Sequence, residues 1–121
     1  MCIRDSITTG EIIDILRDME EIDEEELYAI YITDEEDRVL GSISMMQLVL
    51  NKSDVKVKNI MNENINVIRH NAEINEAVEL TSKYDLLSIP VIDEEEKLIG
   101  AVNAHDLIDE ILYPIWKKKN R

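Results

Sequence analysis

The sequence predicts an α+β fold built from two similar halves. Residues 32–41 and 91–100 both place an acidic turn between two apolar stretches and end in glycine, with Asp34 matching Asp93. Each segment predicts two strands joined by a turn, and a short apolar stretch of helical spacing follows each one. The repeat indicates that a unit of roughly sixty residues was duplicated. Because each half alone would bury only about 60% of its unfolded surface, we expect the halves to share one core.

The first half carries clear start signals for its elements. Thr8-Thr9-Gly10-Glu11 resembles a capping box and precedes apolar residues at helical spacing, whereas residues 1–6 carry no usable pattern. Acidic residues then indicate a solvated loop, and β-branched and aromatic residues indicate a strand. The predicted elements are a helix at 9–20, a loop at 20–26, a strand at 27–32, a turn at 34–38, a strand at 39–44, a helix at 45–50 and a polar linker at 51–57.

The second half repeats this plan. Asn71 is the expected N-cap of its first helix, and Pro114 is expected to close its second. The predicted elements are a strand at 65–68, the helix after Asn71, a strand at 88–92, a turn at 93–97, a strand at 98–103 and a final helix. The order strand, helix, strand, strand, helix predicts a small mixed sheet with both helices on one face. Two such units can stack through their sheet or helix faces and leave two clefts at the junction for ligands.

Composition excludes several classes of function. The 121 residues hold 13 Lys and Arg against 27 Asp and Glu, and the formal net charge of −14 repels nucleic acids and anionic lipids. Cys2 is the only cysteine, which fits a reducing cytosolic setting, and no apolar run is long enough to span a membrane. His70 and His105 have no nucleophile or second histidine near them in sequence, and no phosphate-binding glycine loop is present. We therefore expect no enzymatic activity.

Both halves contain a characteristic motif. An apolar residue and a glycine are followed by a second apolar residue and Ser44 or Asn103, and an amide or acid, Gln47 or Asp106, stands three positions later. This sequence resembles a tandem pair of cystathionine β-synthase (CBS) domains. Further runs resemble the cytosolic CBS pair of MgtE-type magnesium transporters, namely Ile60-Met61-Asn62, Tyr84 to Asp93 with its neighbouring acids, and Ala104 to Asp109. The long acidic link near residues 19–27 is also similar to that family. On this basis residues 1–54 form the first CBS repeat and residues 55–121 the second, with a short basic tail.

The resemblance implies a cytosolic regulatory module rather than an enzyme. In MgtE-like proteins the pair binds Mg²⁺ through interfacial carboxylates and, in some members, ATP, and bound metal favours the closed pore. The pore would lie on another segment or another chain, and the module is expected to form a homodimer. By motif position, the residues that match the metal-linked acids of the family are Glu73, Asp85, Asp106 and Asp109.

The chemistry of Mg²⁺ suits such a set of acids. Mg²⁺ takes oxygen ligands, keeps several waters and uses one or two carboxylates per site. Two unit charges about 4 Å apart repel by about 4 kcal/mol at an effective dielectric near 20, so carboxylates facing each other separate their subunits until a cation neutralises them. Asp106 and Asp109 are three residues apart on a predicted helix, which places both on one side. A solvated acidic surface is the alternative, and we favour it for the turns at 34–37 and 93–96.

A nucleotide site is a second hypothesis. The adenosine site of CBS pairs usually needs a hydroxyl residue and an aspartate three positions later that holds the ribose. Neither copy has both, because Gln47 replaces the aspartate and Asn103 replaces the hydroxyl; both motifs are also expected to cap helices. For ATP or AMP in the second copy, the predicted contacts are Ile89 and Pro90 at the base and Asn103 and Asp106 at the ribose. A dimerisation module without a ligand is the third possibility.

Overall fold

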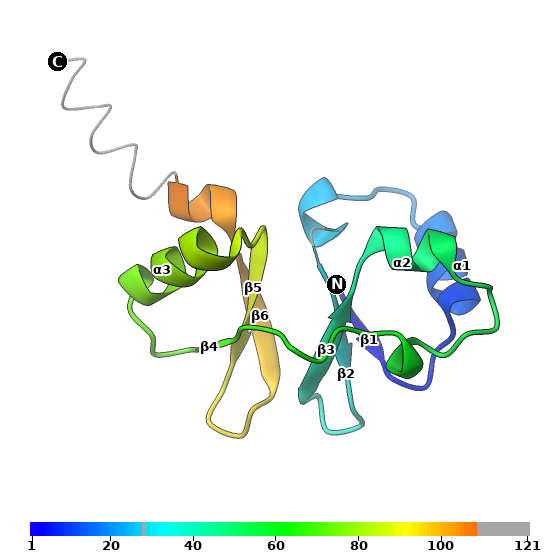
Figure 1. The fold of residues 1–121 in the computed structure, drawn as a ribbon, viewed down its shortest axis with the longest axis horizontal. Helices are drawn as coiled ribbons and strands as arrows, with labels where there is room; N and C mark the ends of the chain where they lie inside the picture. The colour runs from blue at the N-terminus through cyan, green and yellow to red at the C-terminus, as the bar shows by residue number, and fades with distance from the viewer. Residues whose placement is uncertain (28, 109–121) are drawn as a thin grey trace, which may run out of the picture.

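The computed structural model describes residues 1–27 and 29–108, which form two lobes with one small sheet each (Figure 1). The first lobe contains β1 (Cys2–Arg4), α1 (Thr9–Asp18), the 3₁₀ helix η1 (Glu24–Leu27), β2 (Ile30–Thr33), β3 (Val39–Ile43), α2 (Met45–Leu50) and the 3₁₀ helix η2 (Val57–Asn59). The second lobe contains β4 (Ile68–Arg69), α3 (Ile74–Tyr84), β5 (Ser88–Ile92), β6 (Leu98–Asn103) and a helical segment at 104–108. The predicted α+β fold with two β-α-β-β-α repeats is confirmed.

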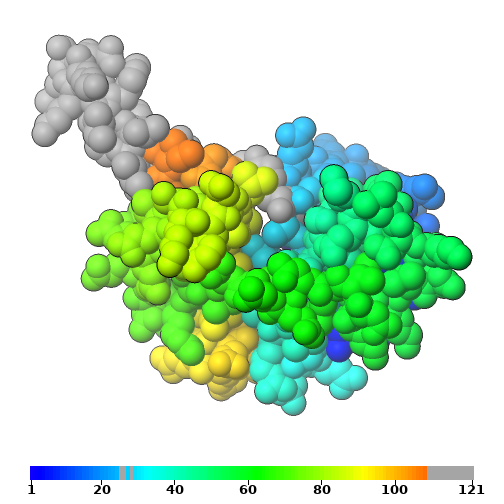
Figure 2. All heavy atoms as spheres, viewed as in Figure 1, coloured from blue at the N-terminus to red at the C-terminus, as the bar shows by residue number. Residues whose placement is uncertain are grey.

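The two sheets have the same topology. Their orders are β1-β2-β3 and β4-β5-β6, and in each the first pair is parallel and the second antiparallel. Ile3 pairs with Ile32 in the first lobe, and Ile68 pairs with the corresponding Val91 in the second. In Figure 1 the sheets face each other at the centre of the molecule, and the helices cover their outer faces. The lobes therefore stack through their sheets, and in the space-filling view they lie against each other (Figure 2).

The strand β1 was missed by the sequence analysis, and its counterpart β4 is shorter. Three residues carry too little periodicity to predict a strand, and β1 forms because β2 lies beside it. In the first lobe the N–H of Tyr31 donates to the carbonyl of Met1 at 2.9 Å. Pro90 stands at the corresponding position of β5 and has no N–H to donate, so the parallel pairing in the second lobe starts only at Ile68.

The expectation of one shared core is wrong, because each lobe has its own. In the first lobe the buried apolar residues are Ile3, Ile12, Leu16, Ile30, Ile32, Ile43, Leu48 and Val57, and in the second they are Ile68, Ala77, Ile89 and Leu107. Alternate residues of a strand point to opposite faces, so Tyr31 and Thr33 of β2 face the other lobe, as do Pro90 and Ile92 of β5. All four are buried, which makes the contact between the sheets a separate third layer.

The repeated acidic turns have nearly identical geometry. Asp34 Oδ1 accepts hydrogen bonds from the N–H groups of Glu36 and Arg38 at 2.8 and 3.0 Å. Asp93 Oδ1 accepts the corresponding pair at 2.8 and 2.9 Å. Asp37 and Glu96 have the same positive φ, 65° and 66°. The tips also touch, because the N–H of Leu98 donates to the carbonyl of Asp37 at 2.9 Å, which ties the lobes together.

Helix starts agree with two of the predicted caps and correct a third. The Thr8 and Ser44 capping boxes are both present, with Glu11 and Gln47 as their reciprocal partners. The N-cap of α3 is Glu73 rather than Asn71. The N–H of Ala72 donates to the carbonyl of Arg69 at 2.9 Å, so a turn holds Asn71 and the helix begins after it.

The linker between the repeats packs tightly on the first lobe. Thr9 donates through its N–H to Val55 and through its hydroxyl to Lys52, at 2.8 and 2.6 Å. Val57 is buried in the first core, and Ile60 and Met61 pack against it. The domain boundary between residues 54 and 55 remains a prediction.

Candidate functional site

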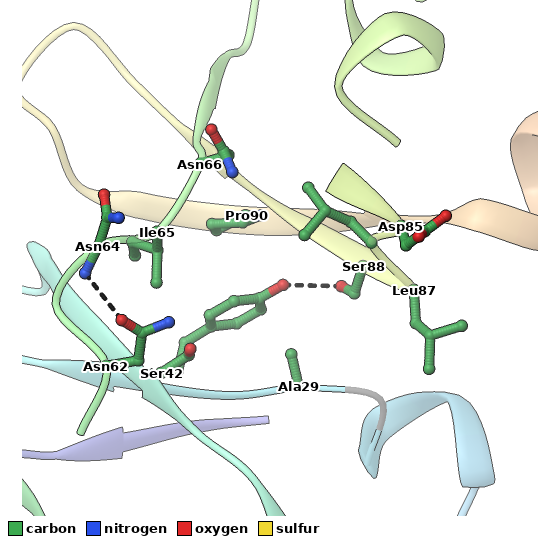
Figure 3. A pocket seen from close by; sticks show the side chains of 12 residues that line it. Ala29, Ser42, Asn62, Asn64, Ile65, Asn66, Asp85, Leu87, Ser88 and Pro90 are labelled. Carbon is green, nitrogen blue, oxygen red and sulfur yellow. Dashed lines mark hydrogen bonds between the residues drawn. The ribbon is translucent and has the colours of Figure 1, made fainter. Parts of the chain in front are cut away.

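A direct side-chain hydrogen bond joins the two lobes where their sheets meet. The hydroxyl of Tyr31 and that of Ser88 are 2.8 Å apart (Figure 3). Burial raises the pKa of Tyr31 above its ordinary value, and the hydrogen bond from Ser88 offsets part of this rise. Tyr31 therefore stays neutral over the physiological range and can donate to Ser88 or to a ligand beside it.

A pocket of about 300 Å³ opens on one side of this pair. Three of its polar side chains come from the stretch before β4, and its apolar side chains come from that stretch, from β5 and the residues before it, and from the first lobe (Figure 3). The lining residues are Ala29, Tyr31, Ser42, Asn62, Asn64, Ile65, Asn66, Asp85, Leu86, Leu87, Ser88 and Pro90. We call this the large interlobe pocket. Its volume is at the lower end of the range for small-molecule sites, and its amides can both donate and accept hydrogen bonds.

A smaller pocket of about 180 Å³ lies on the other side of the Tyr31–Ser88 pair. It is lined by Met1, Asp23, Ala29, Tyr31, Ser88, Ala101 and Asn103. Ala101 of β6 corresponds to Ser42 of β3, because each pairs with the matching residue of the central strand, Pro90 or Tyr31. The two pockets are thus related by the internal repeat, as the sequence led us to expect of the junction. We call the second one the small interlobe pocket.

The residues predicted for nucleotide binding do not gather around one pocket. Pro90 lines the large interlobe pocket and Asn103 lines the small one. Ile89 is only 1% exposed and belongs to the second core, because it points to the opposite face of β5 from Pro90. Asp106 is exposed and lines neither pocket. A nucleotide role for these four residues remains a prediction.

The predicted metal residues are also dispersed. Glu73 and Asp85 cap opposite ends of α3, which separates them by roughly 18 Å along the helix axis. Asp106 lies on the helical segment at 104–108, and Asp109 lies outside the described residues. Within residues 1–27 and 29–108, no group of three His, Cys, Asp or Glu side chains is placed to hold a metal ion.

Asp85 and Asp106 do lie at the same end of the second lobe. The N–H of Ala104 donates to the carbonyl of Leu87 at 2.8 Å, so the segment carrying Asp106 begins beside the end of α3. Asp85 has a left-handed backbone, with a φ of 52°. Asp106 Oδ1 is 3.2 Å from His105 Nε2 and its side chain is 61% exposed. Each of these carboxylates can offer oxygen ligands to a cation at an interface with another segment or chain.

The carboxylates of Asp34 and Asp93 in the acidic turns accept hydrogen bonds from groups of their own turns. For Asp34, burial favours the neutral form, but the N–H groups of Arg38 and Glu36 and the Arg38 side chain lower the pKa below its ordinary value. For Asp93, the N–H of Lys97 is the main cause of a lowered pKa. These two carboxylates close their own turns with hydrogen bonds, which favours a structural role for them over metal binding.

The sequence analysis missed Tyr31 and the three asparagines of the large interlobe pocket. Asn62, Asn64 and Asn66 alternate in sequence just before β4. In an extended chain this spacing places all three side chains on one face, so period-two alternation was the available signal. No comparable signal identified Tyr31, because its position follows from how the two sheets stack.

Comparison with known proteins gives a consistent result. A model of the CBS domain family matches residues 57–113. The magnesium transporter MgtE of Thermus thermophilus is 32% identical over 109 residues, which cover 90% of this chain and 24% of the transporter. MgtE of Enterococcus faecalis is 31% identical over 87 residues, which cover 72% of this chain and 19% of that protein.

A solved structure extends the similarity to three dimensions. The cytosolic domain of the Mg²⁺ channel MgtE, crystallised in complex with ATP, matches with a TM-score of 0.81 and 30% identity over 92% of this chain and 44% of that one. The chain thus spans only a small part of the length of the transporters, and no helix in its described part is long and apolar enough to cross a bilayer. The chain is a tandem pair of CBS domains that resembles the cytosolic CBS region of MgtE-type magnesium transporters.

Proposed function

We propose that this chain is the cytosolic regulatory module of an MgtE-like magnesium transporter and responds to Mg²⁺. The observation that carries the proposal is its similarity along most of its length to MgtE transporters. The net charge of −14 supports a cationic ligand. The pore would be supplied by another segment or chain, and the module would work as a homodimer.

Charge neutralisation at an interface provides the mechanism. Asp85 and Asp106 lie at one end of the second lobe, and Asp109 follows on the same stretch of sequence. Carboxylates of this kind, brought opposite those of a neighbouring subunit or domain, repel it when Mg²⁺ is scarce. Because Mg²⁺ uses one or two carboxylates and several waters, one acid from each side of the interface suffices for a site. Binding then favours the compact arrangement.

Calorimetry and sedimentation velocity test this mechanism. MgCl₂ is titrated into the 121-residue chain, with NaCl of equal ionic strength as the reference, and we expect heat and a rise in sedimentation coefficient in the millimolar range of Mg²⁺. Asp85→Asn and Asp106→Asn should each weaken the response, whereas the hairpin-tip control Glu35→Gln should not. Equal responses in all three variants, or the same response to NaCl, would refute a specific metal interface.

Adenine nucleotide binding is a second candidate function, and the large interlobe pocket favours it. The pocket combines apolar groups from Pro90, Leu86 and Leu87 with the amides of Asn62, Asn64 and Asn66 and the hydroxyl of Ser88. This mixture suits a base and a sugar, and the matched MgtE domain was crystallised with ATP. On this proposal the module senses ATP or AMP in addition to Mg²⁺ or in place of it.

Titration of AMP and then ATP without metal separates the two functions. Micromolar binding heat supports a nucleotide site, and silence with a preserved Mg²⁺ response supports the metal function alone. Asp106→Asn should abolish nucleotide heat if Asp106 holds the ribose, and should leave it unchanged if the nucleotide occupies the large interlobe pocket, which Asp106 does not line. A module that stays silent in every titration and still sediments as a dimer would leave dimerisation as its function.

A further inference from the structure

The polar side chains of the large interlobe pocket are almost all neutral. They are the amides of Asn62, Asn64 and Asn66 and the hydroxyls of Tyr31, Ser42 and Ser88. Asp85 is the one charged residue among the described residues that line the pocket, and these include no lysine, arginine or histidine. The net charge of −14 on the whole chain adds to the negative potential there.

The neutral groups suit a compact, uncharged ligand. The N–H of Asn64 donates to Asn62 Oδ1 at 3.1 Å (Figure 3). This bond holds the oxygen of the Asn62 amide, so its NH₂ group can donate to a ligand. Amides and hydroxyls both donate and accept hydrogen bonds, as do the hydroxyls of a sugar and the polar edge of a base. A volume of about 300 Å³ favours a base with one sugar over a longer molecule.

The end of α3 brings negative charge to this pocket. Asp85 is the C-cap of α3, and its N–H donates to the carbonyl of Thr81. The carbonyl oxygens at the C-terminus of a helix carry partial negative charge, which has the same sign as the Asp85 carboxylate. In Figure 3 Asp85 and Asn62 lie at opposite ends of the pocket. Phosphate groups are favoured at helix N-termini, so this end of α3 repels them.

We infer that the large interlobe pocket selects an uncharged nucleoside over the corresponding nucleotides. The inference rests on the second candidate function above, because it names the ligand class of the same pocket. A phosphate group carries about two negative charges at neutral pH. At roughly 6 Å from one carboxylate, these charges weaken binding by about tenfold even in the dielectric of water. Adenosine therefore binds best, AMP more weakly, and ATP, which carries more charge, most weakly.

Calorimetry in metal-free buffer tests this order. Adenosine, AMP and ATP are each titrated into the 121-residue chain with EDTA present, so that no divalent cation screens the phosphates. We expect the dissociation constant of adenosine to be about tenfold or more below that of AMP. Asn64→Ala should weaken adenosine binding severalfold, because Asn64 lines the pocket.

Two matched variants separate charge from shape. Asp85→Asn removes the carboxylate, and asparagine tolerates the left-handed backbone of this position, with its φ of 52°. AMP should then bind about tenfold more tightly, with adenosine unchanged. Glu79→Gln removes the same charge from an exposed position of α3 that does not line the pocket, and it should leave the ratio of the two dissociation constants unchanged.

The outcomes distinguish this inference from the nucleotide function on which it rests. AMP that binds the parent chain as tightly as adenosine would overturn the inference and leave the nucleotide function standing. Silence with all three ligands would overturn both. A preference for adenosine that persists in Asp85→Asn, or adenosine binding that Asn64→Ala does not change, would also overturn the inference.

Discussion

Alanine substitution at the two matching glycines should have opposite effects on stability. In Gly41→Ala the new Cβ would lie 2.6 Å from a backbone oxygen of Asn62, a distance that real Cβ atoms essentially never show. The chain must relieve the clash by moving residues 61–62 away from β3, which breaks both hydrogen bonds between Ser42 and Asn62. In Gly100→Ala the new Cβ meets no described atom, so nothing has to move.

The magnitudes follow from these contacts. Overpacking costs about 1–3 kcal/mol, and each lost hydrogen bond about 0.5–1.5 kcal/mol. Replacing glycine in a regular element returns roughly 0.5–1 kcal/mol, because alanine loses less backbone entropy on folding. We therefore expect Gly41→Ala to lower the free energy of unfolding by about 1–5 kcal/mol. Gly100→Ala should leave it unchanged or raise it by up to about 1 kcal/mol.

Urea unfolding followed by circular dichroism measures both variants against the parent chain. The midpoint should fall for Gly41→Ala and stay or rise for Gly100→Ala, with unchanged slopes. Equal losses in both variants would show that the β6 edge is covered as closely as the β3 edge. A neutral Gly41→Ala would show that residues 61–62 do not press on that glycine. Either result contradicts the packing argument.

Three further changes test the interlobe contact, a helix cap and the acidic turns. Tyr31→Phe removes the hydrogen bond to Ser88 and should lower the free energy of unfolding by about 0.5–1.5 kcal/mol, whereas Tyr84→Phe on an exposed side chain should not change it in the same urea assay. Ser44→Ala removes the N-cap of α2 and should cost about 1 kcal/mol, which Ser44→Asp should largely restore. The folded pKa of Asp93 is lowered, so its contribution is present above the unfolded value of 3.8 and is lost as the pH falls through the folded value. Asp93→Asn should therefore show a smaller loss of stability between pH 5 and pH 3 than the parent chain, and an unchanged acid slope would contradict the charge argument.

Local patterns in the sequence predicted the elements well because local forces form them. The strand–turn–strand units are confirmed, and residues 45–50, 88–92 and 98–103 were predicted with their observed bounds. The capping boxes at Thr8 and Ser44 were also correct, since both partners of each hydrogen bond lie within one turn of sequence. The strand β1 was missed because its partner β2 is remote in the chain.

The candidate sites were harder to predict because they depend on how the two sheets stack. Sequence alone does not tell which face of β5 meets the other lobe, so Ile89 and Pro90 were assigned to one pocket although they lie on opposite faces. The shared core was expected from the size of each half, and the structure instead places a buried third layer between two small cores. Two acids of the metal hypothesis, Glu73 and Asp85, lie at opposite ends of α3, which only the helix bounds reveal.

Divergence between the repeats explains why the two pockets differ. Ser88 and Ala29 are counterparts, and so are Tyr31 and Pro90. The Tyr31–Ser88 hydrogen bond would therefore have a counterpart between Pro90 and Ala29, whose side chains have no hydrogen-bonding groups. The first lobe thus supplies an aromatic hydroxyl to the contact between the sheets, and the second lobe supplies the Ser88 hydroxyl and an apolar proline. A duplicated fold became a module with two unequal pockets through changes at positions that local sequence patterns leave unconstrained.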